Sequence, residues 1–495
     1  MLRTTAVGVR RPALPAAAAG LAVSSVAVPS LASPSLNRRA FSASPTSSKQ
    51  HLVILGSGWG GYEVLRKVDK RRYDVTVVSP NTYFAFTPLL ASASVGTIEY
   101  DACLEPVRRF PVTFHQAWCD EIDLEHKRLK CMPAIASDAR KAINAHLSSE
   151  TDDTVKPAKA FPGAHKGFEL NYDKLVIAVG AYSQTFGTEG VKEYATFLKD
   201  VRDARKIRSR IYQCFELASL PTVNDQERKN LLNFVIVGGG PTGVEFAGEL
   251  HDLITSDIQR AYPKLAPLAR ISIYDVAPGI LGTFDKSLAQ YASAKFNRDG
   301  IALKTSRHVK SVGESYIEVQ EEGKVPFGLL VWSTGLAPNP LVQTLKGLQH
   351  DEKTHSLRVN EQFNAIGVDG KVRDDIFVLG DASALKEKLP ATAQVASQEA
   401  RWLARHLNAQ ARGRAGASTP FAFNNRGVMA YLGDWDALVD RTKAGSGPKG
   451  EAKGRAAWLL WRSAYFSQAM SIRNKLSLCA HWFWSWAFGR RITRF

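Results

Sequence analysis

Two copies of a glycine-rich turn, each placed directly after an apolar run, constrain the fold of this 495-residue chain more than any other feature. The first is HLVILGSGWGG (51–61), with Gly56, Gly58 and Gly61. The second is NFVIVGGGPTG (233–243), with Gly238, Gly240 and Gly243. A buried strand that turns sharply onto a helix brings backbone N–H groups and the helix N-terminus up to a pyrophosphate. One GxGxxG pattern alone is weak evidence, but two predict two dinucleotide sites.

The first turn is followed by a helical stretch and by a second strand, DVTVVSP (74–80), which completes a βαβ unit. An acidic residue normally ends this second strand and binds the adenosine ribose. Ser79 occupies that position here. We therefore expect the ribose contact to come from Ser79, from Asn81 or from the backbone.

The second βαβ unit does carry the acid. Asp275 ends the strand ISIYDV (271–276), about thirty residues past Gly243 because of extra residues at 256–269. Its carboxylate can accept hydrogen bonds from both ribose hydroxyls and would repel a 2′-phosphate. This favours NADH over NADPH.

A third pattern lies downstream in DDIFVLGDASA (374–384), where an apolar strand delivers Gly380 and Asp381. An aspartate there can bind a flavin ribityl hydroxyl. A helix expected just after Pro390 directs its N-terminal dipole at negative charge on a reduced flavin. Gln394 and Gln398 share one face of this helix, and ordinary helix surface is the alternative interpretation for both.

The order of these motifs predicts an α/β fold with two Rossmann-type domains, the second nested in the first. We assign residues 51–180 and 360–410 to the first domain and 181–359 to the second. The apolar stretch 82–100 is either core or faces an isoalloxazine ring or an oily substrate. Residues 133–167 lack periodicity and are interpreted as an insertion.

Much of the net charge of +17 lies at the two ends of the chain. Residues 1–50 contain no acidic residue and are rich in Ala, Ser, Pro and Arg, which is typical of a mitochondrial targeting region; a disordered tail is the alternative. Within it, the weakly apolar stretch 13–32 approaches spanning length but is broken by Pro15 and Pro29, so we do not assign a membrane span there. Because targeting and anionic lipid account for the basic ends, we do not expect a nucleic-acid partner.

The C-terminal part, 411–495, ends in a basic, aromatic stretch. From Gly454 onward there is no acidic residue, and five of the ten tryptophans lie there. Apolar residues recur at spacings of three and four from Trp458 to Phe483, but the longest uncharged run, 476–489, is too short to span a bilayer. We predict a membrane-surface segment at 455–495. A helical hairpin packed on the protein, or on a second copy in a homodimer, is the alternative.

The five cysteines, Cys103, Cys119, Cys131, Cys214 and Cys479, form no closely spaced pair. This spacing argues against a zinc site, against a disulfide framework and against a dithiol relay beside a flavin. We expect no metal.

Taken together, GSGWGG, VVSP, FTPLL, VGT, VGGGPTGVEFAGEL, VWSTG, LGDAS, ATAQVASQEA and GRRITRF resemble type II NADH dehydrogenases over roughly residues 50–495. These are the single-subunit alternative NADH:quinone oxidoreductases of fungal and plant mitochondria and of bacteria. The resemblance implies FAD at the first site, NADH at the second, and ubiquinone as the acceptor at the mitochondrial inner membrane, without proton pumping. The face of that membrane is not determined by the sequence. No EF-hand pattern is present, so calcium control is not expected.

The resemblance also assigns residues. Around FAD it implies Gly56, Gly58, Gly61, Ser79, Thr87, Gly380, Asp381 and Ala393. Around NADH it implies Gly238, Gly240, Gly243, Asp275, Ser333, Thr334 and Gly335. The catalytic residues it implies are Glu245 near the nicotinamide, and Gln394 and Gln398 on the quinone side of the flavin. Two other functions stay open from the sequence: a flavin-dependent NAD(P)H reductase with a soluble acceptor, and a nucleotide-responsive signalling flavoprotein.

Overall fold

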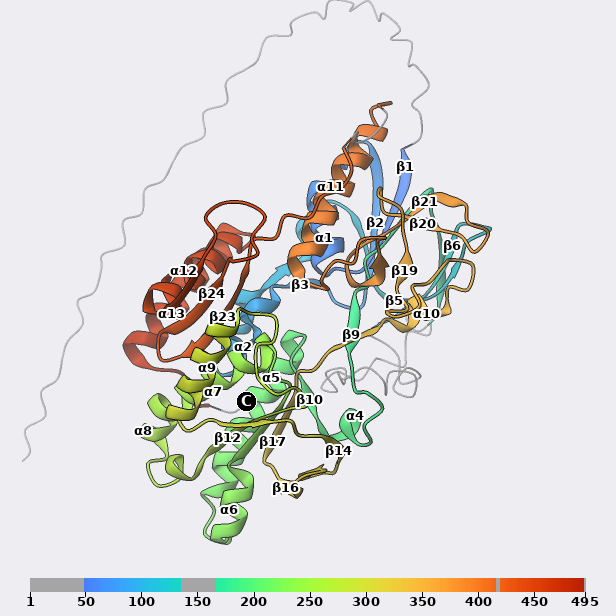
Figure 1. Cartoon of the computed structure of the whole chain (residues 1–495). Helices are drawn as coiled ribbons and strands as arrows, with labels where there is room; N and C mark the ends of the chain where they lie inside the picture. Colours follow the sequence, from blue (N-terminus) through green and yellow to red (C-terminus); the bar gives the residue numbers. More distant parts are fainter. Residues whose placement is uncertain (1–48, 135–165, 415–418, 494–495) are drawn as a thin grey trace, which may run out of the picture. The chain divides into compact units, whose positions relative to one another are not determined.

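The two glycine-rich turns each connect a strand of a parallel sheet to a helix (Figure 1). The structure, a computed structural model, describes residues 49–134, 166–414 and 419–493. The predicted targeting region, apart from its last two residues, and most of the predicted insertion lie outside the described residues.

The first sheet has eight strands, and its central part is parallel. In spatial order they are β20 (Asn364–Ile366), β21 (Val372–Val378), β8 (Lys174–Ile177), β1 (Gln50–Leu55), β2 (Tyr73–Ser79), β5 (Thr113–Asp123), β6 (Arg128–Pro133) and β7 (Phe168–Asn171). The strand β1 is fully enclosed from Leu52 to Leu55, as its apolar run predicts.

The second sheet has five parallel strands, all from the chain between β8 and β21. They are β10 (Thr196–Phe197), β17 (Leu329–Trp332), β11 (Asn233–Val237), β12 (Arg270–Asp275) and β13 (Ala302–Thr305). Beside them lies an antiparallel sheet of β14 (Val309–Val312), β15 (Tyr316–Val319) and β16 (Gly323–Pro326). Since the chain leaves the first sheet, builds the second and returns, the predicted fold class of two nested Rossmann-type units is confirmed.

Two helices far apart in the sequence lie side by side next to β1, namely α1 (Trp59–Lys67) and α11 (Ala393–Gln410) (Figure 1). A buried carboxylate joins them: Glu63 accepts a 2.7 Å hydrogen bond from Nε of Arg401 and a 2.8 Å bond from Nη1 of Arg66. These two arginine contacts offset the cost of burying the Glu63 carboxylate. The helix that follows the GD motif is thereby held against the first glycine-rich turn.

The other helices and short strands connect these units. The helices are α2 (Leu90–Ser94), α4 (Val191–Tyr194), α5 (Val201–Ala218), α6 (Asp225–Leu231), α7 (Pro241–Asp252), α8 (Gln259–Ala261), α9 (Lys286–Arg298) and α10 (Pro340–Thr344). The short strand pairs are β3 (Tyr83–Ala85) with β4 (Leu104–Pro106), β9 (Ala181–Ser183) with β18 (Leu336–Pro338), and β19 (Leu357–Arg358) with β22 (Ser383–Ala384). A π-helical turn, 253–258, continues α7 into the extra residues that precede β12.

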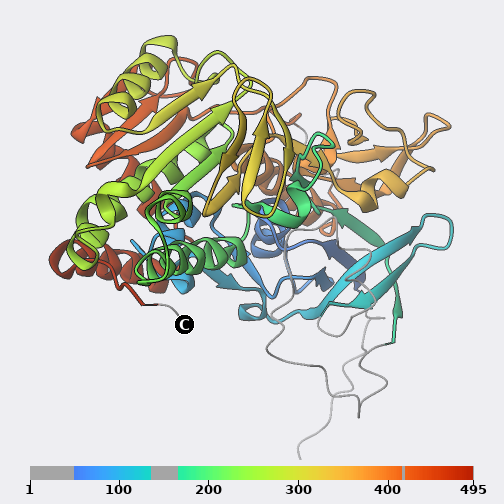
Figure 2. The same ribbon diagram turned by 90° about the horizontal axis from the view of Figure 1, so that it is seen from below.

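The C-terminal part is a sheet followed by a helical hairpin. The strands β23 (Val428–Gly433), β24 (Asp436–Asp440) and β25 (Glu451–Gly454) form an antiparallel sheet, and α12 (Arg455–Gln468) and α13 (Ile472–Phe488) follow. The sheet packs on α7 through β23, so that the red C-terminal elements lie beside the green helices of the second unit (Figure 2). This sheet was not predicted from the sequence.

The helical hairpin has one face on the protein and one face exposed. Trp461 and Tyr465 of α12 and Leu478 and Trp482 of α13 are buried. By contrast, Ile472, Leu476, Trp486 and Phe488 of α13 are 77%, 67%, 64% and 67% exposed. Among the described residues no helix combines the length and the apolar character that crossing a bilayer requires.

Candidate active site

The two glycine-rich turns have the same geometry. Gly56 has a φ of 101° and Gly238 a φ of 115°, in a region that side-chain-bearing residues rarely adopt. The N–H of Gly56 donates to the carbonyl oxygen of Val78, and that of Gly238 to the carbonyl oxygen of Tyr274, each at 2.8 Å. In each turn the last glycine passes so close to the first that a Cβ atom would collide with its carbonyl oxygen. Both turns therefore require glycine at these positions.

Both turns leave a helix N-terminus open. Gly58 directly precedes α1 and Gly240 directly precedes α7 as N-cap residues, without a side-chain cap and without an acidic residue in the first turn of either helix. A Cβ atom built on either glycine would meet nothing within 4 Å. Other helices of this protein are capped by side chains, those of Asp200, Asn224, Asp285, Thr392 and Ser471. Unpaired N–H groups facing open space, with the helix dipole behind them, fit a pyrophosphate at each turn.

At the end of β2, Ser79 and Asn81 both have partners within the protein. The buried hydroxyl of Ser79 lies 2.9 Å from that of Ser57. The side-chain oxygen of Asn81 accepts a 2.8 Å bond from Arg202, and its amide group donates to Asp200 at 3.2 Å. Arg202 could not be predicted from the local pattern, because it comes from the first turn of α5, more than a hundred residues away from this strand.

The GD motif forms a tight turn stabilised by α11. Gly380 has a φ of 64°, and its N–H donates a 2.6 Å hydrogen bond to Glu399. Burial raises the pKa of Glu399 to about 7. Burial also raises the pKa of Asp381, an effect that the nearby Lys199 opposes. Lys199 donates to the carbonyl oxygen of Ala181, and its own pKa is lowered by burial.

Gln394 and Gln398 bind a passing backbone segment. The amide group of Gln398 donates to the carbonyl oxygen of Asn424 at 2.9 Å, and its oxygen accepts the N–H of Asn424 at 3.0 Å. Gln394 makes the equivalent pair of contacts with Gly427 and Arg426, at 2.7 and 3.2 Å. The glutamines are thus more than ordinary helix surface, because they hold the segment 424–427 that leads into β23.

A chain of aromatic rings connects the first turn with the C-terminal hairpin. Trp59, whose Nε1 donates to Thr87 at 3.0 Å, has its ring centroid 5.3 Å from that of Phe86. The centroid of Phe86 lies 6.1 Å from that of Tyr465, which in turn lies 4.8 Å from that of Trp461. The apolar stretch 82–100 is therefore partly core, and through Phe86 it also contacts the C-terminal helices.

Glu245 lies at the end of this aromatic chain. Its Oε1 accepts hydrogen bonds from the N–H of Tyr431 and from Nε1 of Trp461, both at 3.2 Å. Burial raises the pKa of Glu245 to about 8, an effect that these two bonds reduce. Burial therefore favours the protonated form of this carboxyl group at neutral pH. Both donors face Oε1, which leaves Oε2 as the oxygen available to carry a proton.

At the second turn, Asp275 is near the open N-terminus of α7. Its Oδ2 accepts the N–H of Gly239 at 2.5 Å, and its Oδ1 accepts the N–H of Ala277 at 2.7 Å. Each oxygen keeps a lone pair for a ribose hydroxyl. Ser333 ends β17 against Gly238, with Oγ 3.3 Å from its carbonyl oxygen, while the hydroxyl of Thr334 donates to Gln184 at 2.6 Å. Gly335 follows directly on the exposed side.

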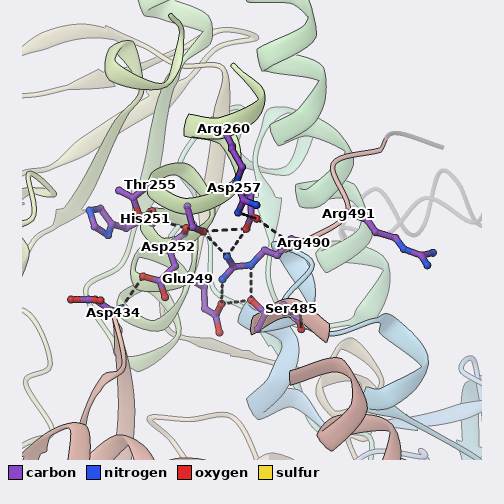
Figure 3. Close-up of polar contacts among 12 residues, drawn as sticks. Glu249, His251, Asp252, Thr255, Asp257, Arg260, Asp434, Ser485, Arg490 and Arg491 are labelled. Carbon is purple, nitrogen blue, oxygen red and sulfur yellow. Dashed lines mark hydrogen bonds and ion pairs between the residues drawn. The ribbon is translucent and has the colours of Figure 1, made fainter. Parts of the chain in front are cut away.

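Figure 3 shows how the chain beyond α13 joins the other units. Nη1 of Arg490 lies 2.9 Å from Asp257 of the π-helical turn, and its Nη2 lies 3.6 Å from Glu249 of α7. Its Nε donates to Thr97 at 3.0 Å, and Thr97 donates to Glu249 at 2.6 Å. One buried arginine thereby connects the C-terminal segment with the helix that carries Glu245.

The comparisons with known proteins agree along nearly the whole chain. A family described as pyridine nucleotide-disulphide oxidoreductase matches residues 50–400, and one described as NDH2 C-terminal domain matches residues 425–491. A probable NADH dehydrogenase of Dictyostelium discoideum is 36% identical over 449 residues, which are 90% of this chain and 91% of that protein. The chain belongs to the type II NADH dehydrogenase family.

Other relatives support this family. The mitochondrial external NADH-ubiquinone oxidoreductase 2 of Saccharomyces cerevisiae is 35% identical over 476 residues, covering 89% of this chain and 82% of that protein. The structure of NDH2 from Plasmodium falciparum in complex with NADH superposes with a TM-score of 0.78 at 25% identity, covering 90% of this chain and 100% of that one. The resemblance found in the sequence is therefore confirmed, and with it the use of a flavin and NADH.

In this type II NADH dehydrogenase, several residues around the site were not foreseen. Lys199 and Glu399 beside the GD turn, and Tyr431, Trp461 and Tyr465 around Glu245, all meet their partners across long sequence separations. The signal that was available for Glu399 is its place in the AQVASQEA motif, one residue after Gln398.

Proposed function

We propose that this protein is a non-proton-pumping NADH:ubiquinone oxidoreductase with FAD at the first turn and NADH at the second, bound peripherally to the mitochondrial inner membrane. The observation that supports it best is the pair of open, glycine-capped helix N-termini, one of which is joined by aromatic rings to a hairpin with an exposed apolar face. Family membership gives the same electron donor and acceptor.

The first turn fits the FAD pyrophosphate, because the N–H groups at the start of α1 are unpaired and face open space. We assign Gly56, Gly58 and Gly61 to this contact, with Ser79 beside the adenosine. Thr87, Gly380, Asp381 and Ala393 then face the rest of the cofactor. A flavin held there would supply the hydride acceptor for NADH and the two-electron donor for the quinone. The protein binds and orients both partners, and no side chain has to act as a nucleophile.

The second turn binds NADH in this proposal. Gly238, Gly240 and Gly243 admit the pyrophosphate, and Ser333, Thr334 and Gly335 flank it at the end of β17. Asp275 accepts hydrogen bonds from the ribose hydroxyls with the lone pairs that Gly239 and Ala277 leave unused. Because the carboxylate repels a 2′-phosphate, it selects NADH over NADPH.

Glu245 holds a proton for the quinone. Burial favours the protonated form of this carboxyl group at neutral pH, its Oε2 is the oxygen that Tyr431 and Trp461 leave free, and the group is buried beside Tyr431, Trp461 and Tyr465. A carboxyl group with a pKa near the working pH can donate a proton and be reprotonated. Gln394 and Gln398 act on the quinone side by holding the segment 424–427 in place.

The C-terminal hairpin attaches the protein to the membrane surface through residues 455–495. Exposed Leu, Ile, Trp and Phe side chains on α12 and α13 accompany arginine and lysine, with no acid from Gly454 onward. That combination suits a bilayer interface. The domain boundaries, 51–180 with 360–410 and 181–359, and the possible homodimer stay predictions.

The test is a steady-state assay with purified, flavin-containing protein in detergent. We expect NADH oxidation that depends on an added short-chain ubiquinone. Turnover with a soluble protein acceptor but not with any quinone would favour the alternative of a soluble-acceptor reductase. Negligible turnover with every acceptor, together with a nucleotide-dependent change of assembly, would favour the signalling flavoprotein.

A further inference from the structure

Arg462 of α12 is surrounded by aromatic rings in the groove between α12 and α13. Its Cζ lies 4.5 Å from the ring centroids of both Trp458 and Trp482, and 5.9 Å from that of Trp435. Trp435 lies in the turn between β23 and β24, and Trp482 is buried on α13. Elements from three parts of the C-terminal region therefore enclose one guanidinium group.

This cation lacks a counter-ion within the part of the chain that the structure describes. Its Nε is buried without a hydrogen-bond partner, and no carboxylate forms an ion pair with it among those residues. Burial lowers the pKa of Arg462, and the acid that opposes this effect most is Glu249. Glu249, however, is already bound by Ser92, Thr97 and Arg490.

Arg462 is half-buried, and only its Nε is fully removed from solvent. Contact with aromatic rings contributes about 0.5–2 kcal/mol per favourable pair, and the two terminal nitrogens stay available to an anion. Arg490, the other half-buried arginine of this segment, shows the usual arrangement, with carboxylates of Asp257 and Glu249 beside it. The geometry at Arg462 is therefore that of a binding group prepared for an external anion.

A cavity beside Arg462 can receive such an anion. It has a volume of about 230 Å³ and is lined by Arg462, Ser463, Phe466, Cys479 and Trp482. Lys475 brings a second cation near, with its Nζ 5.5 Å from the ring centroid of Phe466, which lines the cavity. Pockets that enclose whole small molecules measure about 300–1,000 Å³, so this one suits a headgroup whose chains stay outside.

The surroundings select among possible anions. Exposed Leu459, Leu460, Ile472, Leu476 and Phe483 lie on the same two helices. A free phosphate or nucleotide would gain nothing from these side chains, whereas acyl chains would pack on them. No acidic residue of the sequence follows Gly454, so a net negative headgroup is not repelled locally.

We propose that the groove between α12 and α13 is a binding site for one anionic phospholipid. Its phosphate accepts hydrogen bonds from the two terminal nitrogens of Arg462, Lys475 adds a second positive charge, and its acyl chains lie along the exposed apolar side chains. Arginine suits this contact, because its planar fork matches two phosphate oxygens. This inference rests on the proposed attachment to a membrane and names the lipid class that it requires.

The test compares Arg462→Met with Arg473→Met, which removes the same charge from an exposed position on α13. The full-length, flavin-containing protein is mixed with vesicles of phosphatidylcholine alone, or of phosphatidylcholine and phosphatidylglycerol mixed four to one, and binding is measured by co-sedimentation. An exposed basic residue contributes about 1 kcal/mol near an anionic surface, which is roughly fivefold in affinity. We expect the control to lose about that much on the mixed vesicles, and Arg462→Met to lose tenfold or more.

A second measurement uses the unchanged protein, so that it does not depend on the folding of a variant. Soluble short-chain phosphatidylglycerol should produce a saturable change in tryptophan fluorescence, because Trp458 and Trp482 border the site. Arg462→Lys, which keeps the charge but loses the fork, should weaken this response several-fold.

Three outcomes would overturn the inference. Equal losses for Arg462→Met and the control would mean diffuse attraction to the surface. A fluorescence change produced equally by inorganic phosphate would mean a site for free anions. If the unchanged protein bound neither kind of vesicle, membrane attachment itself would be wrong. In the first outcome the unchanged protein still binds the vesicles, so only the lipid site is overturned and the membrane attachment stands.

Discussion

The clearest consequence of the geometry around Glu245 is a pH-dependent contribution to stability, tested by Glu245→Gln. Burial raises the pKa of this carboxyl group from 4.5 to about 8 in the folded protein. Between these two values the folded state holds a proton that the unfolded state has released. The free energy of unfolding should therefore fall with rising pH by about 1.4 kcal/mol per unit, and this contribution should level off above the folded pKa.

Glutamine keeps the acceptor oxygen for Tyr431 and Trp461 but does not titrate. From pH 6 to pH 8 the wild type should lose about 2 kcal/mol relative to Glu245→Gln, which is a few degrees in Tm. Thermal unfolding of both proteins across this range measures the difference. The matched control is Glu314→Gln, at an exposed turn residue, which should follow the wild type.

The same substitution has a kinetic readout. If Oε2 of Glu245 supplies a proton, Glu245→Gln should reduce kcat for quinone reduction and remove the titration near pH 8 from its pH profile, while flavin reduction by NADH stays fast. Parallel stability curves for wild type and variant would refute the argument from burial. An unchanged pH profile of kcat would refute the role as proton donor.

Three further predictions address other parts of the site. Asp275→Ser should raise the KM for NADH about 10- to 100-fold and reduce the preference for NADH over NADPH, because charge-assisted hydrogen bonds to the ribose are lost. Steady-state kinetics with both nucleotides measures this change. Gln398→Ala should lower the free energy of unfolding by about 1–3 kcal/mol, measured by denaturant titration, since the backbone groups of Asn424 lose both partners. Arg490→Met should cost about 3–5 kcal/mol and make the C-terminal segment sensitive to limited proteolysis, because Glu249 is left as an uncompensated buried charge.

The parts of the fold that follow from local pattern could be predicted from the sequence. An apolar run followed by glycines at fixed spacing can adopt few backbone structures. The turns at Gly56 and Gly238 and the strand before Gly380 therefore lie where expected. The order of these motifs was sufficient for the nested topology. The family was confirmed by the comparisons.

The contacts that depend on distant segments could not be predicted. The spacing of Gln394 and Gln398 shows that they share a helix face, but only the folded chain brings residues 424–427 onto that face. The strands β23 and β24 were not predicted, although VMAYLGDWDALVD alternates around a Gly-Asp turn. The whole region was instead assigned from the aromatic helical pattern that follows these strands.

Sequence spacing also concealed one pairing and one helix break. Cys119 and Cys131 lie opposite one another on β5 and β6, and a hydrogen bond from Cys119 lowers the pKa of Cys131. The apolar positions from Trp458 to Phe483 read as one stripe, whereas the chain breaks between α12 and α13 and turns Trp461 inward and Leu476 outward. A periodicity does not reveal where a helix ends when the residues at the break continue the pattern.

The central claim is that electrons pass from NADH through a bound flavin to a quinone, and stopped-flow absorbance of the flavin tests it most directly. Purified protein in detergent is mixed first with NADH and then with a short-chain ubiquinone. The account predicts rapid loss of flavin absorbance with NADH, slower loss with NADPH, and recovery when the quinone is added. Loss of absorbance without recovery by any quinone, or no loss with NADH at all, would contradict it.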